Sequence, residues 1–199
     1  MKVHPDTNSI EQLQAMIGRC ELCKASFSHD PRPIVSFHPK TKIVIIGQAP
    51  GRIVHETQIP WNDVSGDNLR AWMGIEKNIF YDNKFVSIVP MGFCYPGKGR
   101  SGDLPPSKRC APQWHSQILN YLNEVQLIIL IGKYAQDYYL PDNKKNLTNT
   151  VSNYRDYLPR YFVLPHPSPR NNIWMKKNPW FAEEVLPVLK EVVSSALEQ

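Results

Sequence analysis

Four cysteines carry the most distinctive chemistry in this 199-residue sequence. They form two pairs: Cys20 and Cys23 in a C-x-x-C spacing, and Cys94 and Cys110 further along the chain. Disulfides are rare in a reducing compartment, and four thiolates suit either zinc or an iron–sulfur cluster. A C-x-x-C also occurs in redox motifs and by chance, and free thiols can pack in small apolar niches. The two pairs therefore predict a bound metal, with unligated thiols as the alternative.

A second group of candidate residues lies around Gly47, directly after an apolar run at 43–46. The run consists of β-branched residues, which is typical of a strand buried on both faces. Gly47 ends the run, and the stretch 48–51, which contains Pro50 and Gly51, requires a sharp loop. Ligands bind at the carboxyl ends of strands in open α/β sheets. The loop is therefore a candidate binding site, although an ordinary strand-to-loop turn has the same pattern.

The sequence is basic, with 23 Lys and Arg against 18 Asp and Glu and a pI of about 9.0. The cations concentrate in two loops beside glycine and proline residues. The first loop includes Arg100 and Lys108, and the second includes Arg170. A solvated charged surface accounts for either loop alone, but the two together favour a polyanionic partner such as nucleic acid.

Length and composition indicate one globular domain over residues 1–199, with 42% hydrophobic residues. No apolar run approaches the ~20 residues needed to cross a bilayer, so no membrane segment is expected. The N-terminal residues contain no apolar signal-peptide core. A cytoplasmic protein is therefore expected.

Hydrophobic periodicity places the candidate residues between strands and helices. Four buried strands are expected at 42–46, 85–89, 127–131 and 161–164. Helices are expected at 9–18, 65–74, from Pro112, at 133–139, and from about Pro179 with an interruption at Pro187. Loops are expected at 26–41 and 141–157. Strands that alternate with helices predict an α/β fold with a short, mainly parallel four-stranded sheet covered on both faces.

Four features in chain order resemble the uracil-DNA glycosylase superfamily, in particular its iron–sulfur branches, called families four and five. The resemblance covers about residues 20–172. The Cys20/Cys23 pair precedes the first strand, and Cys94 and Cys110 stand sixteen positions apart, as in those families. The two active-site motifs are similar to Gly47-Gln48-Ala49-Pro50-Gly51 and to His166-Pro167-Ser168-x-x-Asn171.

The resemblance implies a three-layer α/β/α sandwich with its active site at the carboxyl ends of the strands. It also implies a 4Fe–4S cluster on Cys20, Cys23, Cys94 and Cys110, which favours iron–sulfur over zinc. In these families the cluster orders the basic loop and takes no part in the chemistry. A monomer is the usual state in the superfamily.

The resemblance also implies two catalytic residues. Cleavage of an N-glycosidic bond passes through an oxocarbenium-like sugar, after the nucleotide has left the base stack. Asp63 begins a segment, Asp63-Val64-Ser65-Gly66-Asp67, that is similar to the carboxylate segment of family five, and would orient water. His166 would donate a hydrogen bond to the base oxygen as charge builds there. The simpler interpretations are that Asp63 caps the following helix and that His166 only hydrogen-bonds its own turn.

The remaining site residues divide between base and backbone contacts. The base would be held by Gly47, Gln48, Ala49, Ser168 and Asn171, and would stack on Trp61. Arg100, Lys108 and Arg170 would bind DNA, and Arg170 with its neighbours would either enter the duplex or contact the phosphates beside the vacated position. Trp61 is equally typical of a core residue, and Asn171 of an Asx-turn.

Two positions depart from the families' pattern. Family four has glutamate where this chain has Gln48, and both families have an asparagine that reads uracil where this chain has Pro90. The resemblance therefore does not carry uracil reading over to this chain. No lysine lies in a motif typical of a Schiff-base nucleophile, so we expect base removal without strand cleavage.

We therefore expect a monofunctional DNA glycosylase of base-excision repair. Its substrate would be a deaminated base in DNA: uracil, or else hypoxanthine or xanthine. A non-catalytic DNA-binding module that retains the glycosylase fold is the main alternative, supported by Pro90 and Gln48. A hydrolase acting on free nucleosides or nucleotides is a third possibility.

Overall fold

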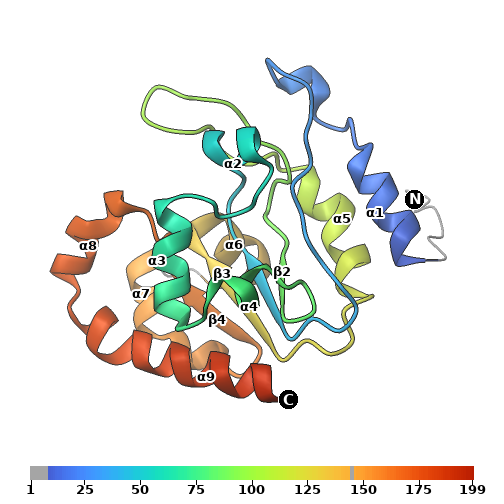
Figure 1. Ribbon diagram of the computed structural model, residues 1–199. Helices are drawn as coiled ribbons and strands as arrows, with labels where there is room; N and C mark the ends of the chain where they lie inside the picture. Colours follow the sequence, from blue (N-terminus) through green and yellow to red (C-terminus); the bar gives the residue numbers. More distant parts are fainter. Residues whose placement is uncertain (1–8, 144–145) are drawn as a thin grey trace.

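The computed structural model describes residues 9–143 and 146–199, which fold around one parallel sheet (Figure 1). The strand order is β2-β1-β3-β4. The strands are β1 (Ile43–Ile46), β2 (Val86–Ile88), β3 (Leu127–Ile131) and β4 (Tyr161–Leu164). Every neighbouring pair is parallel, which confirms the expected sheet and makes it fully parallel. Each strand lies within one residue of its expected bounds.

The two central strands, β1 and β3, are buried along their whole length. All residues of β1 and β3 are buried, and Ile43 pairs with Leu127 at the start of a continuous register. Burying each such side chain contributes about 1.5–3 kcal/mol, which favours this arrangement of β-branched residues. The chain leaves β1 for β2 on one side and later crosses to β3 on the other. The carboxyl end of β1 therefore lies at a switch point, where open α/β sheets bind ligands.

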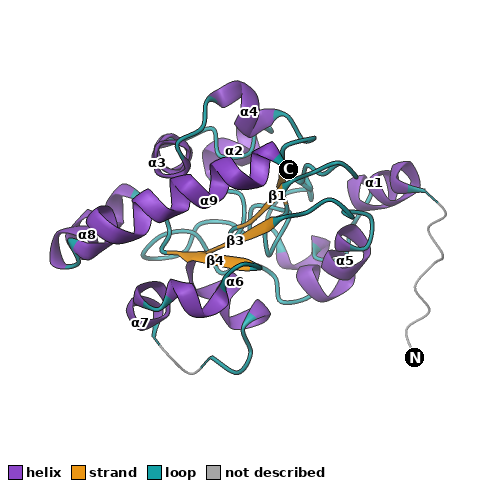
Figure 2. Ribbon diagram, turned by 90° about the horizontal axis from the view of Figure 1, so that it is seen from below, coloured by secondary structure: helices purple, strands orange, loops and turns teal. Residues whose placement is uncertain are grey.

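Helices cover both faces of the sheet, as Figure 2 shows. On one face α3 (Val64–Met73) packs against α9 (Leu186–Glu198), and α9 also contacts β1. On the other face α6 (Gly132–Tyr139) packs on β3 and β4, and α7 (Leu147–Ser152) packs on β4. The three-layer α/β/α architecture is therefore confirmed.

Two further helices form a pair at one end of the sheet. They are α1 (Ile10–Gly18) and α5 (Cys110–Leu119), which contact one another. Ser9 caps α1 as expected, because its hydroxyl accepts a 3.2 Å hydrogen bond from the backbone N–H of Gln12. Pro112 lies in the first turn of α5, where its missing N–H needs no helical partner.

Sequence periodicity missed several short elements. They are α2 (Arg52–Thr57), α4 (Lys77–Tyr81) and α8 (Asn172–Lys177), together with the 3₁₀ turns η1 (Lys24–Ser26) and η3 (Pro169–Asn171). Helices of five or six residues cover less than two turns, so they cannot show an apolar period.

The expectation of a loop over 141–157 is wrong. This stretch contains α7 and the 3₁₀ helix η2 (Tyr154–Tyr157), while residues 144 and 145 lie outside the described part. The Asn146 side chain caps α7 by accepting a 2.9 Å hydrogen bond from the N–H of Asn149. The helix buries Val151 against the core, although its composition is polar. Capping and one buried face outweigh its low helix propensity.

The C-terminal helix is interrupted at the expected proline. A π-helical turn, η4 (Phe181–Val185), leads into α9, and Pro187 lies in the first turn of α9. The wider π turn leaves the proline at a position where no intrahelical N–H is required. None of the helices in the described ranges has the length and apolar character needed to span a membrane.

Candidate active site

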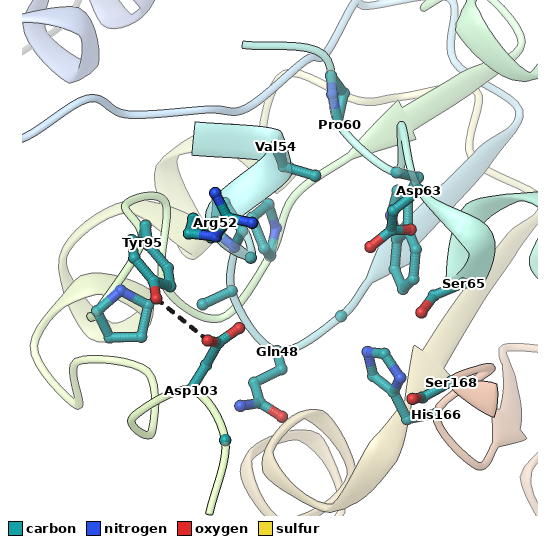
Figure 3. A pocket seen from close by; sticks show the side chains of 18 of the residues that line it. Gln48, Arg52, Val54, Pro60, Asp63, Ser65, Tyr95, Asp103, His166 and Ser168 are labelled. Carbon is teal, nitrogen blue, oxygen red and sulfur yellow. Dashed lines mark hydrogen bonds between the residues drawn. The ribbon is translucent and has the colours of Figure 1, made fainter. Parts of the chain in front are cut away.

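A cavity of about 630 Å³ opens at the carboxyl ends of the strands (Figure 3). Its wall includes Gln48 after β1, Pro90 after β2 and His166 after β4, together with a hairpin at 97–104. The volume lies within the ~300–1,000 Å³ typical of small-molecule pockets. Segments that are far apart in the sequence therefore meet at one edge of the sheet.

Asp63 lines this cavity from the start of α3 and also caps that helix. Its Oδ1 accepts a 2.9 Å hydrogen bond from the backbone N–H of Gly66. The simpler interpretation of Asp63 as a cap is therefore confirmed. A carboxylate has about four lone-pair sites, so this bond leaves acceptor capacity facing the cavity.

His166 lines the same cavity at the end of β4 and is largely buried. Burial lowers the pKa of its imidazole below the ordinary 6.5, and the nearby Asp63 carboxylate partly offsets this. The pKa shift favours a neutral ring, which carries one N–H donor and one acceptor nitrogen. Asp63 and His166 therefore lie in the same pocket (Figure 3), and the Asp63 carboxylate is close enough to affect the pKa of the imidazole.

The loop that presents His166 is held by three side-chain amides. Asn171 donates a 2.7 Å hydrogen bond to the backbone carbonyl of His166, and Asn68 donates a 2.8 Å bond to that of Pro167. Gln136 is buried and donates a 2.9 Å bond to the carbonyl of Leu164 at the end of β4. Asn171 therefore fixes its loop, but not by the Asx-turn that the simpler interpretation predicted, because its amide donates to a carbonyl five residues earlier. The roles of Asn68 and Gln136 depend on long-range contacts, and no local pattern could have revealed them.

Gln48 lies in Figure 3 between Asp103 and His166. Its carboxamide makes no hydrogen bond to the described residues, while its backbone carbonyl accepts a 3.0 Å bond from Gly92. Pro90, the residue at the position of the family asparagine, also lines the cavity and offers no side-chain donor or acceptor. The amide of Gln48 is therefore available to a ligand at this side of the pocket.

The position of Pro90 is fixed by the buried His115. The Nε2 of His115 is 3.0 Å from the Pro90 carbonyl oxygen, and its Nδ1 is 2.6 Å from the Tyr139 hydroxyl. Burial lowers the pKa of His115 to about 4, so the ring is neutral near pH 7. A carbonyl can only accept, so Nε2 carries the proton and Nδ1 accepts from Tyr139. His115 thus ties the end of β2 to α5 and α6.

Trp61 forms part of the cavity wall next to His166. The centroids of the two rings are 5.7 Å apart at an interplanar angle of 33°. A Cβ placed on Gly47 would lie 2.9 Å from Cζ2 of the Trp61 ring, so only glycine leaves room for the indole there. The glycine that ends β1 is therefore required for the shape of the pocket.

A second carboxylate, Asp103, lines the cavity and was missed from the sequence. It belongs to the hairpin at 97–104, where the Lys98 strand pairs with the Asp103 strand, and accepts a 3.2 Å hydrogen bond from the Tyr95 hydroxyl. The only signal for it was the glycine spacing of a tight turn, with Gly99 and Gly102 at the tip. Asp103 and Asp63 therefore both face the pocket.

The family is now decided by a comparison with known protein families. A sequence model of the uracil DNA glycosylase superfamily matches residues 35–190, which is most of the chain. The chain belongs to this superfamily. The match includes both active-site segments and Cys94 and Cys110, but not Cys20 and Cys23. The superfamily resemblance is thus confirmed, while the assignment to an iron–sulfur branch stays a prediction.

The other expected base contacts of this glycosylase-superfamily chain also line the cavity. They are Gly47, Ala49, Ser168 and Asn171. The Ser168 hydroxyl accepts a 3.3 Å hydrogen bond from the N–H of Arg170, so it caps the turn η3. The first and second motifs are therefore brought together, although the described hydrogen bonds use Ser168 and Asn171 within their own loop.

The three expected DNA-binding cations lie at different places. Arg170 lines the cavity, and its Nη1 donates a 3.3 Å hydrogen bond to the carbonyl of Ser101 at the hairpin tip. Arg100 is exposed at the same tip. Lys108 is exposed just before α5 and does not line the cavity. Arg170 thus joins the two basic loops at the mouth of the pocket.

All four cysteines of this superfamily member line a second, smaller cavity, next to the segment that follows α1 and to the first residue of α5. Burial raises the pKa of Cys94 to about 11 and that of Cys110 to about 12, and the neighbouring thiols add to both shifts. The backbone N–H of Phe93 donates a 3.4 Å bond to the Cys110 sulfur, and the Cys23 sulfur is 3.0 Å from the Ser107 hydroxyl. The two sequence pairs therefore meet at one place.

The four thiols fit a sulfur-ligated group by their chemistry. Within the described ranges, no three His, Cys, Asp or Glu side chains lie close enough together to hold a single metal ion. The thiols instead surround a cavity lined by apolar residues such as Phe27 and Phe93, and the Cys110 sulfur accepts a hydrogen bond from the N–H of Phe93. Buried thiolates with such donors are typical ligands of iron–sulfur clusters.

Proposed function

We propose that this protein is a monofunctional DNA glycosylase that removes a deaminated base, in base-excision repair. The observation that carries the proposal is the meeting of Asp63 and His166 in one pocket beside a free amide and an indole face. Superfamily membership supports a glycosylase-like hydrolase acting on DNA. The base identity and the residue roles are our own inference.

The proposed reaction needs opposite charges to be stabilised at two ends of the scissile bond. The sugar becomes oxocarbenium-like as the N-glycosidic bond breaks, and the departing base becomes negative. The Asp63 carboxylate stabilises the sugar cation and orients the attacking water. The neutral His166 donates its N–H to the base oxygen where negative charge develops. The Gly66 bond to Oδ1 fixes the carboxylate rather than consuming it.

Gln48 supplies the base-reading group that Pro90 lacks. Its carboxamide offers one acceptor and two donors. A deaminated base presents a carbonyl beside a ring N–H, which needs one donor and one acceptor. Uracil, hypoxanthine and xanthine share this edge, so the proposal covers all three. Trp61 provides the apolar face on which the extruded base stacks.

DNA reaches the pocket along the two basic loops. Arg170 and Arg100, which lie together at the hairpin tip, bind phosphates at the mouth, and Lys98 lines the rim. Lys98 is exposed, and the pocket places no catalytic lysine in an apolar niche, which supports base removal without strand cleavage. Lys108 contributes to the same basic surface nearer the cysteines.

The proposed cofactor is a 4Fe–4S cluster held by Cys20, Cys23, Cys94 and Cys110, with zinc as the alternative. When bound, it cross-links the segment after α1 to the loop that precedes α5 and takes no part in bond cleavage. Ligation requires thiolates, so the raised pKa values of Cys94 and Cys110 make the ligand-free thiols protonated near pH 7.

The test is abasic-site formation on duplex oligonucleotides that each contain one uracil, hypoxanthine or xanthine. The wild type is compared with Asp63→Ala and with Asp137→Asn, which removes a carboxylate from an exposed ion pair on α6. We expect activity on at least one base, lost in Asp63→Ala and retained in Asp137→Asn. DNA binding without cleavage of any base would instead support a binding module that keeps the glycosylase fold.

A further inference from the structure

Trp61 has a backbone conformation that large side chains rarely adopt. Its φ is 54°, in a region where non-glycine residues are uncommon. Such a conformation persists only where the surrounding structure determines it, and it occurs often at functional sites. The contacts that hold Trp61 are therefore informative.

The Trp61 carbonyl oxygen is held by two side chains from other elements. Nη1 of Arg70, on α3, donates a 3.3 Å hydrogen bond to it, and the Tyr81 hydroxyl, on α4, donates another of 3.3 Å. Arg70 and Tyr81 also bond to one another at 3.2 Å. The carbonyl that the unusual φ turns inward thus meets two donors.

Arg70 itself is fixed on every side. Only 6% of the residue is exposed, and its Nη2 donates a 2.6 Å bond to Oδ1 of Asp67. Its guanidinium lies 5.1 Å from the ring centroid of the buried Phe80 and 5.5 Å from that of Tyr81. A cation in this environment has one rotamer, so it presents Nη1 at a constant place.

Gly66 provides the space for this arrangement. A Cβ at Gly66 would lie only 1.8 Å from the Trp61 carbonyl oxygen. The same glycine donates its N–H to Asp63. The backbone of Trp61 is thus pressed against the turn that carries the carboxylate, while its indole covers Gly47 and faces His166.

We propose that Arg70 and Tyr81 are positioning residues that hold Trp61 in its positive-φ conformation, so that the indole forms a fixed wall of the base pocket. Neither side chain lines the cavity, so they act through Trp61 rather than on the substrate. The consequence for catalysis rests on the proposed function, whereas the positioning itself does not. The short helix α4 contributes to this arrangement, because it places the Tyr81 hydroxyl next to the Trp61 carbonyl.

The experiment compares Tyr81→Phe with Tyr154→Phe. The Tyr154 hydroxyl is buried without a partner among the described residues, so each variant removes one tyrosine hydroxyl, but only Tyr81→Phe removes a bond to Trp61. All five tryptophans are labelled with 5-fluorotryptophan, and the Trp61 signal in the ¹⁹F NMR spectrum is assigned with Trp61→Phe. We expect Tyr81→Phe to shift or broaden the Trp61 signal alone, and Tyr154→Phe to leave it unchanged. An unchanged Trp61 signal in Tyr81→Phe overturns the proposal.

A second variant and a kinetic readout separate positioning from simple destabilisation. Asp67→Asn weakens the anchor of Arg70 at an exposed carboxylate and should shift the same signal by less. On a duplex that contains whichever base the wild type removes (uracil, hypoxanthine or xanthine), Tyr81→Phe should lower the single-turnover rate by up to about tenfold, which corresponds to the loss of one hydrogen bond, with unchanged DNA affinity. Equal losses in Tyr81→Phe and Tyr154→Phe would overturn the positioning role. An inactive wild type would overturn the proposed glycosylase, while the NMR result would still decide the positioning.

Discussion

The side-chain amide of Asn171 donates a 2.7 Å hydrogen bond to the backbone carbonyl of His166. The two residues lie on the same loop, which leaves β4 and turns back through η3. Asn68 holds the next carbonyl of that loop from α3, the helix that Asp63 caps. The loop that carries His166 is thus bonded to the helix that Asp63 caps. The distance between these two candidate catalytic residues is therefore fixed by the side-chain amides of Asn171 and Asn68, which have no proposed part in the reaction.

Replacement of Asn171 by alanine should slow base removal more than it destabilises the fold. Asn178→Ala is the matched control, because its amide also donates to a main-chain carbonyl, that of Trp174, at 2.8 Å. Each variant should lose about 1 kcal/mol of stability, the net value of one such bond. Only Asn171→Ala should lower turnover, measured as abasic sites formed per minute. Equal turnover in the two variants would mean that the loop is held sufficiently by Asn68.

The two roles of Asp63 can be separated by its two simplest substitutions. Asparagine is as good an N-cap as aspartate, so Asp63→Asn should keep the thermal midpoint while removing the carboxylate charge. Asp63→Ala removes both and should cost about 1 kcal/mol of stability as well. If the carboxylate stabilises the transition state, both variants should lose about 100-fold or more in rate. If Asp63→Asn is active, Asp63 acts only as a helix cap, and Asp103 becomes the candidate catalytic carboxylate.

The sequence was most informative where function follows directly after a buried strand. Short, unbroken apolar runs predict β1 and β4 as buried strands, and Gln48 and His166 each lie two residues beyond the end of their strand. Residues that act across the fold left no such pattern. Asn68 and Arg70 lie on a predicted helix, but their partners are distant carbonyls that only the folded chain brings near.

The short helices could not be predicted from the sequence for a different reason. Helix α4 spans only five residues, and α7 reads as polar, so neither shows a period that separates helix from loop. Asp103 was hidden in what appeared to be a basic loop, since hairpin pairing depends on backbone bonds rather than on side-chain type. The missing information is therefore long-range contact rather than local preference.

Stability should fall as the pH decreases from about 6.5 to 4, because of His115. Its pKa is lowered to about 4 in the folded protein and is ordinary, near 6.5, in the unfolded chain. Between these values the unfolded state binds the extra proton, so unfolding becomes easier as the pH falls. The loss approaches about 3 kcal/mol at pH 4, and buried His166 adds to it with the same sign.

Urea unfolding at several pH values checks this expectation. In His115→Gln the free energy of unfolding should start lower at pH 7, because the bonds to Pro90 and Tyr139 change. It should then decline less between pH 6.5 and 4 than in the wild type. Parallel curves for the two proteins would show that His115 does not carry the dependence.

Salt dependence should identify which cations touch DNA. Arg170→Ala removes a guanidinium at the mouth of the pocket and should reduce the slope of log affinity against log salt by about 1. Arg160→Ala is the control, because Arg160 precedes β4 and so lies at the opposite, amino end of the strands. It should leave the slope unchanged. Equal slopes for the wild type and Arg170→Ala would restrict Arg170 to its bond with Ser101.

The cysteine cavity predicts the metal content of the purified protein. A 4Fe–4S cluster requires about four iron and four sulfide per chain and gives a brown protein. The double variant Cys20→Ala/Cys23→Ala removes the two ligands that precede β1 and should lose both iron and colour. About one zinc per chain in a colourless protein would select the zinc alternative. If the wild type contains no metal and the double variant has the same thermal midpoint, the four thiols are packing residues only.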